Sequence, residues 1–392
     1  MTSTLELANK LSTDMTLWRH HLHQHPEFGF EEVATGGFIV ARLREFGVSE
    51  VATGVGGTGV VATVRKGTSN KAIGIRADMD ALRIDEAGTP SYRSTTPGVM
   101  HACGHDGHTT ILLGLAKLLN ENIIFDGVIH LIFQPAEEWG KGMLAMLDDG
   151  LLDRFPIEEA YGLHNMPGFP VGEFATRSGA IMAAEDNFAI QISGKGGHAS
   201  RPQDHADALV AACAVVMALQ TIVSRHIDPA QLSVLSVTEM QTDGTRNAVA
   251  GSATITGDTR SFDPAVSLQI ESGMRRVVEG TAAAHGCTAT VDYTREFVPL
   301  INDDELTQSA ILAAKAAAYT PENVNANYDR IGASEDFAQL LQHVPGNFMF
   351  LGNGDSASLH NPSYDFNDAA LPHGVAYFAE LVKARLPVQL AS

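Results

Sequence analysis

Four short apolar runs of strand type each lead into residues that can bind a metal ion or move a proton. Runs of this length and hydrophobicity are typical of buried strands in a parallel sheet. Residues 109–119 (TTILLGLAKLL) lie between two of them and repeat their apolar side chains on one helical face. The polar residues are Asp78 and Asp80 after residues 71–77, Glu137 and Glu138 after residues 128–133, His164 after residues 160–163, and His360 in the loop after residues 348–351. This alternation predicts an α/β fold with a mostly parallel sheet covered on both faces.

The carboxyl ends of such strands are where an open α/β sheet binds its ligands. Histidines and carboxylates with a purely structural role have no reason to follow strand ends again and again. Glu138, His164 and His360 are weak signals one at a time. Their shared placement predicts that they belong to one site.

Residues 185–297 follow a different pattern. Their order β-α-β-β-α-β is typical of the split βαβ, ferredoxin-like fold. The strands are expected at residues 187–193, 232–240, 253–261 and 288–293, and the helices at residues 204–224 and 267–285. A chain of 392 residues exceeds what one core usually serves. We therefore expect an α+β domain inserted into a catalytic domain that comprises residues 1–184 and 298–392.

Charge and composition exclude several classes of protein. The 26 basic and 46 acidic residues give a net charge of −20, and no Lys/Arg run is present that could follow a phosphate backbone. We expect no nucleic-acid partner. The three cysteines, an odd number without paired spacing, argue against a disulfide framework. The N-terminus lacks a signal-peptide pattern, and no uninterrupted apolar stretch approaches the ~18 residues of a spanning helix. A cytoplasmic protein without a membrane partner is the expectation.

The densest chemical cluster is residues 101–108 (HACGHDGH), at the start of the predicted helix. It holds one thiol, Cys103, and three imidazoles, His101, His105 and His108. Thiolate and imidazole are the ligands that zinc and its neighbours prefer. A helix N-terminus and a bound cation both favour a thiolate. The alternative, a polar loop without a ligand, is disfavoured by the density of these groups.

The second cluster is the pair of adjacent carboxylates, Glu137 and Glu138. Neighbouring side chains on a helix point about 100° apart, so the two need not share a task. One could bind metal while the other serves as a base, and the residues alone do not decide which. A solvated acidic loop is the alternative, but the apolar run just before it makes burial the better interpretation.

These motifs resemble the metal-dependent amidohydrolases that include hippurate hydrolases, auxin-conjugate hydrolases and bacterial aminoacylases. The resemblance runs nearly end to end, and its most specific blocks are Cys103-Gly104-His105-Asp106 and Pro135-Ala136-Glu137-Glu138. Other matching blocks are residues 19–23 (RHHLH), 77–82 (ADMDAL), 194–199 (GKGGHA), 334–337 (SEDF) and 359–362 (LHNP).

The resemblance implies hydrolysis of the amide bond of N-acyl amino acids with N-acetyl, N-benzoyl or arylacetyl groups. It implies two divalent metal ions per subunit, of zinc, manganese, cobalt or nickel. The implied metal ligands are Cys103, His105, Glu138, His164 and His360. Glu137 would be the general base, and Asp80 would orient a metal ligand.

The resemblance also assigns residues in the inserted domain. His198 would stabilise the oxyanion of the reaction in the active site of a partner subunit, which implies a homodimer or a tetramer. Arg260 and Asn247 would bind the substrate, because a guanidinium holds a carboxylate with two hydrogen bonds. A turn histidine and two strand-edge polar residues are the alternative interpretations.

The chain departs from the family pattern near the substrate. Ala248-Val249-Ala250 follows Asn247 where Val-Ile-Pro is usual, Arg83 stands where Pro is usual, and Pro202-Gln203 replaces Pro-His. None of these changes affects an implied ligand, but they leave the acyl group and the amino acid open.

Four other functions are alternatives to the hydrolysis of N-acyl amino acids. A cysteine hydrolase would use Cys103 as nucleophile. A dipeptidase or aminopeptidase would use the same two-metal centre on a free substrate amine. A binding module on a decayed hydrolase fold would lack a ligand or the base, and here all are present. A zinc nucleobase deaminase would need a Pro-Cys-x-x-Cys segment, which the chain lacks.

Overall fold

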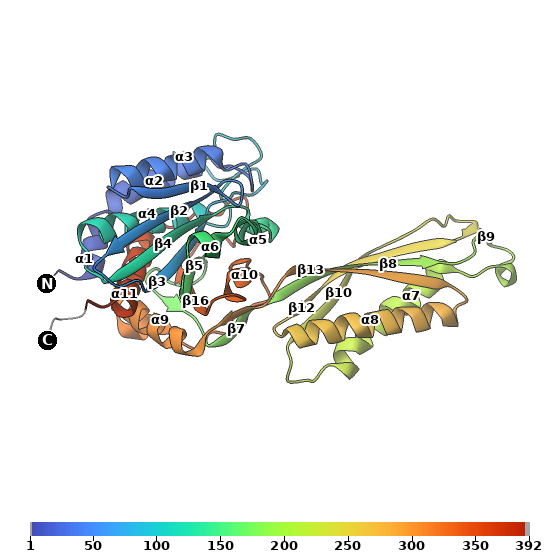
Figure 1. Cartoon of the computed structure of the whole chain (residues 1–392). Helices are drawn as coiled ribbons and strands as arrows, with labels where there is room; N and C mark the ends of the chain where they lie inside the picture. The colour runs from blue at the N-terminus through green and yellow to red at the C-terminus, as the bar shows by residue number, and fades with distance from the viewer. Residues whose placement is uncertain (1, 389–392) are drawn as a thin grey trace. The chain divides into compact units, whose positions relative to one another are not determined.

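The computed structural model describes residues 2–388 and divides into two compact units (Figure 1). The first unit consists of residues up to Gly179 together with Ile301–Asp329 and the residues from Asp336 onward. The inserted unit consists of Ala180–Leu300 and Arg330–Glu335. The chain passes between the units at β7 (Gly179–Met182), at β14 (Leu300–Asn302) and at both ends of Arg330–Glu335.

The first unit is built on an eight-stranded sheet in the order β1-β2-β4-β3-β5-β16-β6-β15. Its central strands, β4, β3, β5 and β16, are parallel to one another, and β1 and β2 run antiparallel at one edge. The strands are β1 (Glu50–Val55), β2 (Gly59–Lys66), β3 (Ala72–Asp78), β4 (Gly127–Gln134), β5 (Glu159–Met166), β6 (Phe174–Ala175), β15 (Val324–Asn325) and β16 (Gly346–Gly352). The predicted mostly parallel α/β sheet is confirmed.

Helices cover both faces of this sheet. The larger core lies on the face covered by α4, α9 and α11, where Ile73 and Ile75 of β3 and Leu131 of β4 are fully buried. Because side chains alternate along a strand, Arg76 points to the other face, where its guanidinium contacts Asp336 at 3.1 Å. The helices are α1 (Thr4–Asn9), α2 (Ser12–Gln24), α3 (Val33–Glu45), α4 (His105–Glu121), α5 (Gly142–Asp148), α6 (Leu151–Arg154), α9 (Asp304–Ala317), α10 (Phe337–Leu341) and α11 (Leu371–Arg385).

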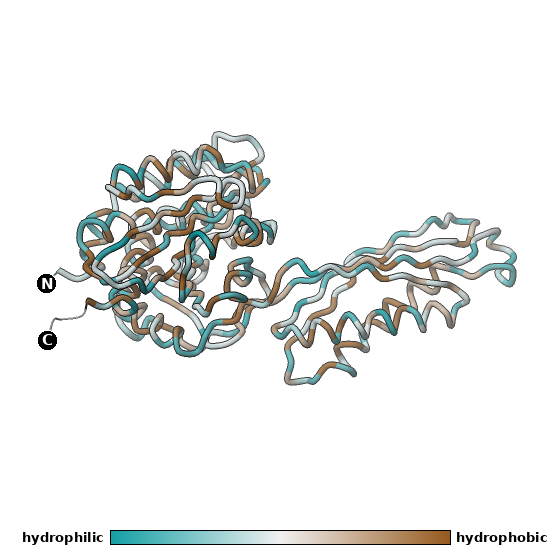
Figure 2. The backbone as a smooth tube through the Cα atoms, in the orientation of Figure 1, coloured by the Kyte–Doolittle hydropathy of each residue, from teal (hydrophilic) through white to brown (hydrophobic). Residues whose placement is uncertain are grey.

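The central strands are rich in apolar residues, which Figure 2 draws in brown. All residues of β3, β4 and β16 are buried, which is why these short runs are recognisable in the sequence. Two strands end later than expected. Asp78 is the last residue of β3 and does not follow it. The strand β5 continues through Asn165 to Met166, so His164 lies inside the strand and not after its end. The parallel ladder with β16 extends past His164 and keeps this part of the chain in the sheet.

The inserted unit has a four-stranded antiparallel sheet in the order β10-β12-β8-β13. Its elements are β8 (Ala184–Ser193), β9 (Gly197–His198), α7 (Ala208–Thr221) with a π-helical end (Ile222–His226), β10 (Ser233–Thr242), β11 (Ala248–Val249), β12 (Ser252–Ser261), α8 (Pro264–Ala284) and β13 (Thr288–Phe297). Both helices pack on one face of the sheet and enclose a separate core. This arrangement matches the ferredoxin-like fold that the element order predicts.

One helix of the inserted unit is unusually apolar. Among the described residues, Ala208–His226 is the helix that is long and apolar enough, by length and composition, to cross a membrane. A helix in the core of a soluble protein can meet the same criteria, and Ala211, Val215 and Leu219 are fully buried against the sheet at helical spacing. Only 33% of the apolar stretch of this helix is buried within the chain, so much of the helix surface is exposed.

Candidate metal centre

A tight turn before α4 positions the dense cluster of residues 101–108. Gly104 has a φ of 91°, in the left-handed region that glycine adopts without strain. A Cβ at this position would lie 2.3 Å from the Nδ2 atom of Asn165. Glycine is therefore required here, and the turn presents Cys103 and His105 on either side of it at the carboxyl edge of the sheet.

The five side chains expected to bind metal come together in two groups that share one residue. The donor atoms of Cys103, His105 and His164 lie within 4.8 Å of one another. Those of Cys103, Glu138 and His360 do so as well. The Sγ atom of Cys103 is 3.4 Å from Nε2 of His164, and Oε1 of Glu138 is 3.2 Å from Nε2 of His360. Thiolate, imidazole and carboxylate together suit a first-row divalent ion.

Hydrogen bonds around two of these histidines leave their Nε2 atoms for a ligand. Nδ1 of His105 lies 3.0 Å from both the carbonyl and a carboxylate oxygen of Asp80. Nδ1 of His164 lies 2.6 Å from the carbonyl oxygen of Asn165. Carbonyl oxygens only accept, so each Nδ1 carries a hydrogen, and in the neutral ring each Nε2 has the lone pair that a metal ion binds. Nε2 of His105 is buried without a hydrogen-bond partner in the described part of the chain. A bound cation would give this buried polar atom a partner.

The thiol of Cys103 is a poor nucleophile in this environment. It is 7% exposed, and burial raises its pKa well above the usual range, with the charges of Glu138 and Glu137 acting in the same direction. A cysteine hydrolase needs the opposite shift, because the thiolate is the reactive form. A divalent cation would instead displace the proton and make Cys103 a ligand.

The remaining histidines of the cluster are placed differently. Nδ1 of His108 lies 2.6 Å from Oδ1 of Asp78, and its Nε2 accepts the backbone N–H of Asn165 at 2.9 Å. Because both of its ring nitrogens are engaged, His108 supports the site and does not bind metal. His101 is buried, and burial lowers its pKa to about 4. Nothing in the structure gives His101 a role.

The two glutamates lie in a 3₁₀ turn, Glu137–Trp139, directly after β4. Ala136 enters this turn with a φ of 48°, and its N–H donates to the buried carboxylate of Glu32 at 2.9 Å. Successive side chains of a 3₁₀ turn point about 120° apart, so Glu137 and Glu138 diverge. Glu137 is 6% exposed, and its carboxylate still lies within 4.8 Å of that of Glu138. The turn thus places two carboxylates beside the donor groups, with their side chains in different directions.

A buried ion-pair network holds the segment that follows His360. Arg19 is fully buried and contacts Asp365 at 2.9 Å, Asp368 at 2.7 Å and Asp106 at 3.5 Å. Asp106 is the second residue of α4, so Arg19 connects this segment to the helix that begins with the ligand-type histidine. The motif at residues 19–23 marks Arg19 in the sequence but does not predict this role.

In the inserted unit, the structure brings His198 and Asn247 together. β9 pairs with β11, and His198 lies opposite Ala248, the neighbour of Asn247. Arg260 is not with them. It lies near the far end of β12, eight residues from the start of that strand. At about 3.3 Å per residue, this spacing places Arg260 about 26 Å from the end where His198 and Asn247 lie.

The guanidinium of Arg260 is already engaged. It contacts Glu185 and Asp258 at 2.7 Å each and donates to Oγ of Ser334 at 2.9 Å. Its side chain is 25% exposed, on the sheet face that α7 and α8 leave uncovered. A substrate carboxylate at Arg260 would therefore compete with two acidic side chains.

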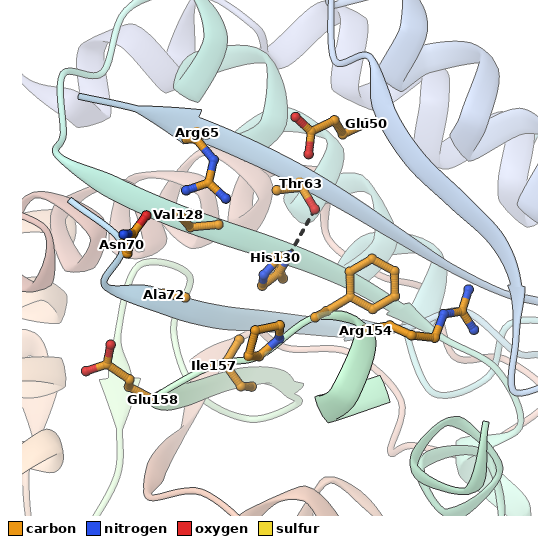
Figure 3. Close-up of a pocket in the computed structure, with 12 residues that line it drawn as sticks. Glu50, Thr63, Arg65, Asn70, Ala72, Val128, His130, Arg154, Ile157 and Glu158 are labelled. Carbon is orange, nitrogen blue, oxygen red and sulfur yellow. Dashed lines mark hydrogen bonds between the residues drawn. The ribbon is translucent and has the colours of Figure 1, made fainter. Parts of the chain in front are cut away.

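The first unit also has a cavity of about 440 Å³ that is separate from these residues (Figure 3). Ala72, Val128 and Ile157 line it, together with the ring of His130. These residues lie at the amino ends of β3 and β4 and before β5. The cavity is therefore at the opposite edge of the sheet from the candidate metal centre.

Comparison with known proteins places the chain in a family. The family described as peptidase family M20/M25/M40 matches residues 74–384. Hippurate hydrolase of Campylobacter jejuni is 38% identical over 93% of this chain and 94% of its own. IAA-amino acid hydrolase ILR1-like 4 of Arabidopsis thaliana is 37% identical over 96% of this chain and 87% of its own. The crystal structure of Bacillus subtilis YXEP protein, described as a dinuclear metal binding peptidase from the M20 family, is 32% identical, with a TM-score of 0.85 over 95% of this chain and 98% of that one. The family match spans most of the chain, and the chain belongs to the peptidase family M20/M25/M40.

Proposed function

We propose that this protein hydrolyses the amide bond of N-acyl amino acids and releases a carboxylic acid and a free amino acid. The observation that carries the proposal is the pair of overlapping donor groups that share Cys103, beside the buried carboxylate of Glu137. The names of two relatives, hippurate hydrolase and IAA-amino acid hydrolase, describe enzymes that act on such conjugates.

Two divalent ions would be held by Cys103, His105, Glu138, His164 and His360. When bound, such ions lower the pKa of water and polarise the substrate carbonyl. The donor set suits zinc, manganese, cobalt or nickel, and availability in the cell decides among ions of this kind. Asp80 would orient the site, because it contacts Nδ1 of His105 and accepts the backbone N–H of Glu138 at 3.1 Å.

Glu137 would be the general base. Its carboxylate is buried beside the donor groups, and a base must lie within hydrogen-bond reach of the water that it deprotonates. It would take the proton as the water attacks the amide carbonyl and deliver it to the leaving nitrogen. Proton transfer of this kind needs no group on the substrate other than the amide.

His198, Asn247 and Arg260 would complete the site, and their spacing supports a dimer. About 26 Å separates Arg260 from the other two along the sheet of one chain, which is too far for one small substrate to span. We infer that a partner subunit supplies one of the two sets. The resemblance assigns His198, as an oxyanion donor, to the partner's site.

The inserted unit offers a surface for this partner. β10 is an edge strand of ten residues, and Val234 and Met240 on it are 48% and 40% exposed. On α7, Val210 is 50% and Met217 71% exposed. An unpaired edge beside an apolar helix face is a surface that a second copy would cover. We attribute the apolar character of α7 to this contact and propose a cytoplasmic homodimer.

A dipeptidase or aminopeptidase using the same centre is the second candidate function. It is favoured by the description of the Bacillus subtilis structure as a peptidase. Such an enzyme would recognise a free substrate amine, which an N-acyl amino acid lacks.

The test is a substrate panel before and after metal removal. N-acetyl, N-benzoyl and indoleacetyl amino acids are assayed beside dipeptides. We expect turnover of the N-acyl compounds, loss of it on dialysis against a chelator, and recovery with Mn²⁺, Zn²⁺, Co²⁺ or Ni²⁺. Turnover of dipeptides alone would support the second candidate, and activity that survives chelation would refute the metal mechanism.

A further inference from the structure

Three aromatic side chains gather beside the turn that carries the two glutamates. The ring centroids of Phe28 and Trp139 are 5.1 Å apart, with the ring planes at 63°. Those of Phe30 and Trp139 are 6.4 Å apart, with the planes at 83°. The guanidinium of Arg83 lies over the ring of Phe28 at 4.0 Å from its centroid. Phe28, Phe30 and Trp139 are called the aromatic rim below.

The loop that carries Phe28 is fixed to both segments that build the metal centre. Phe28 forms a β-bridge with Ala81, the residue after Asp80. A Cβ at Gly29 would lie 3.0 Å from Cβ of Ala136, so the loop is in close contact with the turn that carries the glutamates. The aromatic rim therefore lies at the same carboxyl edge of the sheet as the donor groups.

The aromatic rim is exposed at a cost to the folded protein. Phe30 and Trp139 are 36% and 43% exposed, although burial of an aromatic side chain is favourable. Phe30 also has a φ of 64°, a conformation that a residue with a side chain adopts only under constraint. Exposed aromatic side chains held in this way are typical of a surface that receives a ligand.

We infer that the aromatic rim is the subsite for the acyl group and selects an aromatic acyl group, such as benzoyl or arylacetyl. The inference rests on the proposed function. The carbonyl carbon that water attacks belongs to the acyl group, so the substituent on this carbon must lie next to Glu137. Trp139 is two residues from Glu137 in the same 3₁₀ turn. A substrate ring gains edge-to-face contacts there that an acetyl group is too small to make.

Arg83 contributes to the same surface. It is the residue that stands where the family usually has proline, and its side chain is 66% exposed while it lies over Phe28. The cation holds the face of that ring and extends the rim toward solvent. The departure from the family pattern thus falls on the acyl subsite and not on a metal ligand.

The test compares two substrates that differ only in the acyl group. We expect Trp139→Ala to lower the ratio of kcat/KM for an N-benzoyl amino acid to that for the N-acetyl form about tenfold, the size of effect that loss of a hydrophobic contact has on specificity. Trp139→Phe retains a ring and should restore much of the ratio. Ile124→Ala is the control, because Ile124 is 75% exposed at the other edge of the sheet, and it should leave the ratio unchanged.

An equal loss for both substrates in Trp139→Ala would overturn the inference, because it would show that Trp139 only supports the turn. Wild-type activity of Trp139→Ala on both substrates would overturn it too, because Trp139 would then contribute nothing to the selection of the acyl group. A wild type that hydrolyses neither substrate refutes the proposed function before any variant is made.

Ring binding can be measured without turnover. The chain has two tryptophans, and the other, Trp18, is 8% exposed. We expect N-benzoylglycine to change the fluorescence of the metal-loaded Glu137→Gln variant in a saturable way. The change should be smaller with N-acetylglycine and absent when Trp139→Phe is added. Equal changes with the two compounds would count against an aromatic subsite.

Discussion

His105 points its Nδ1 at Asp80 from 3.0 Å and leaves its Nε2 buried without a hydrogen-bond partner in the described part of the chain. Asp80 also accepts the backbone N–H of Glu138. One carboxylate therefore orients an imidazole and fixes the position of a second ligand-type residue. This relationship predicts a role for Asp80 in metal affinity and not in the chemical step.

We expect Asp80→Asn to weaken metal binding about 10–100-fold, as removal of such an orienting partner does in other metal sites. Competition with a fluorescent chelator measures the affinity. Asp153→Asn, an exposed aspartate of the same unit, is the control and should bind metal like the wild type. Unchanged affinity with reduced turnover would show that Asp80 acts on the substrate instead.

Glu137→Gln should abolish most of the activity and keep the metals. Loss of a general base lowers turnover about 10²–10⁴-fold, while the isosteric amide preserves the 3₁₀ turn. Metal content is measured by elemental analysis and turnover on an N-acyl amino acid. Glu158→Gln, an exposed glutamate, should behave like the wild type. Retained turnover in Glu137→Gln would remove the base from the mechanism.

The sequence predicts the strands that are buried on both faces and misses those that are not. The apolar runs that become β3, β4 and β16 are recognisable because every residue in them is buried. β1 and β2 form an antiparallel edge with Thr, Gly and Arg among their residues and give a weaker pattern. β6 and β15 have two residues each, too few for any periodicity.

The site could be predicted only as far as local spacing reaches. The cluster of residues 101–108 marks a ligand-rich segment, but tertiary partners decide which histidine is available. Asp78 forms a hydrogen bond with His108, and Asp80 forms one with His105 and orients its ring. The two aspartates look alike in the sequence. The distance of Arg260 from His198 and Asn247 likewise depends on the length and register of β12, which no motif records.

Proton release on metal binding should report the state of Cys103. Burial raises the pKa of this thiol well above its usual range, so the metal-free protein holds it protonated at pH 7. Metal binding by the thiolate must then release that proton. We expect titration of the chelated protein with Zn²⁺ in weak buffer to release about one proton more from the wild type than from Cys103→Ser. Cys213→Ser, at an exposed thiol, should match the wild type. Equal release from Cys103→Ser would mean that Cys103 is not a ligand.

The stability of the first unit should fall in mild acid because of His130. Burial lowers the pKa of His130 to about 4, and the charge of Arg65 adds to the effect. The folded protein holds this ring neutral while the unfolded chain protonates it near pH 6.5. The stabilisation is therefore complete above pH 6.5 and is lost as the pH falls toward 4, by about 3 kcal/mol.

Denaturant unfolding at pH 7, 5.5 and 4 measures this effect. His130→Gln keeps a hydrogen-bonding side chain for Thr63 and should flatten the pH dependence. His343→Gln, at an exposed histidine, should retain the wild-type slope. The same slope in His130→Gln would assign the acid sensitivity to other groups.

Mixing two inactive variants would show whether His198 acts in a partner's site. His198→Ala lacks the proposed oxyanion donor, and Glu137→Gln lacks the base. In a hybrid dimer in which His198 crosses between subunits, one site has both defects and the other has none. The intact site combines Glu137 of one chain with His198 of the other. Co-refolding or co-expression should therefore restore part of the activity that neither variant shows alone.

A histidine that serves its own subunit gives the opposite result. Each site of the hybrid then carries one defect, and activity stays at the level of the separate variants. A monomer gives this result too, so the mass of the mixed species is measured by light scattering in the same sample. About 26 Å along the sheet of one subunit separates Arg260 from His198 and Asn247. One subunit therefore cannot place all three side chains on the same small substrate. This separation favours complementation.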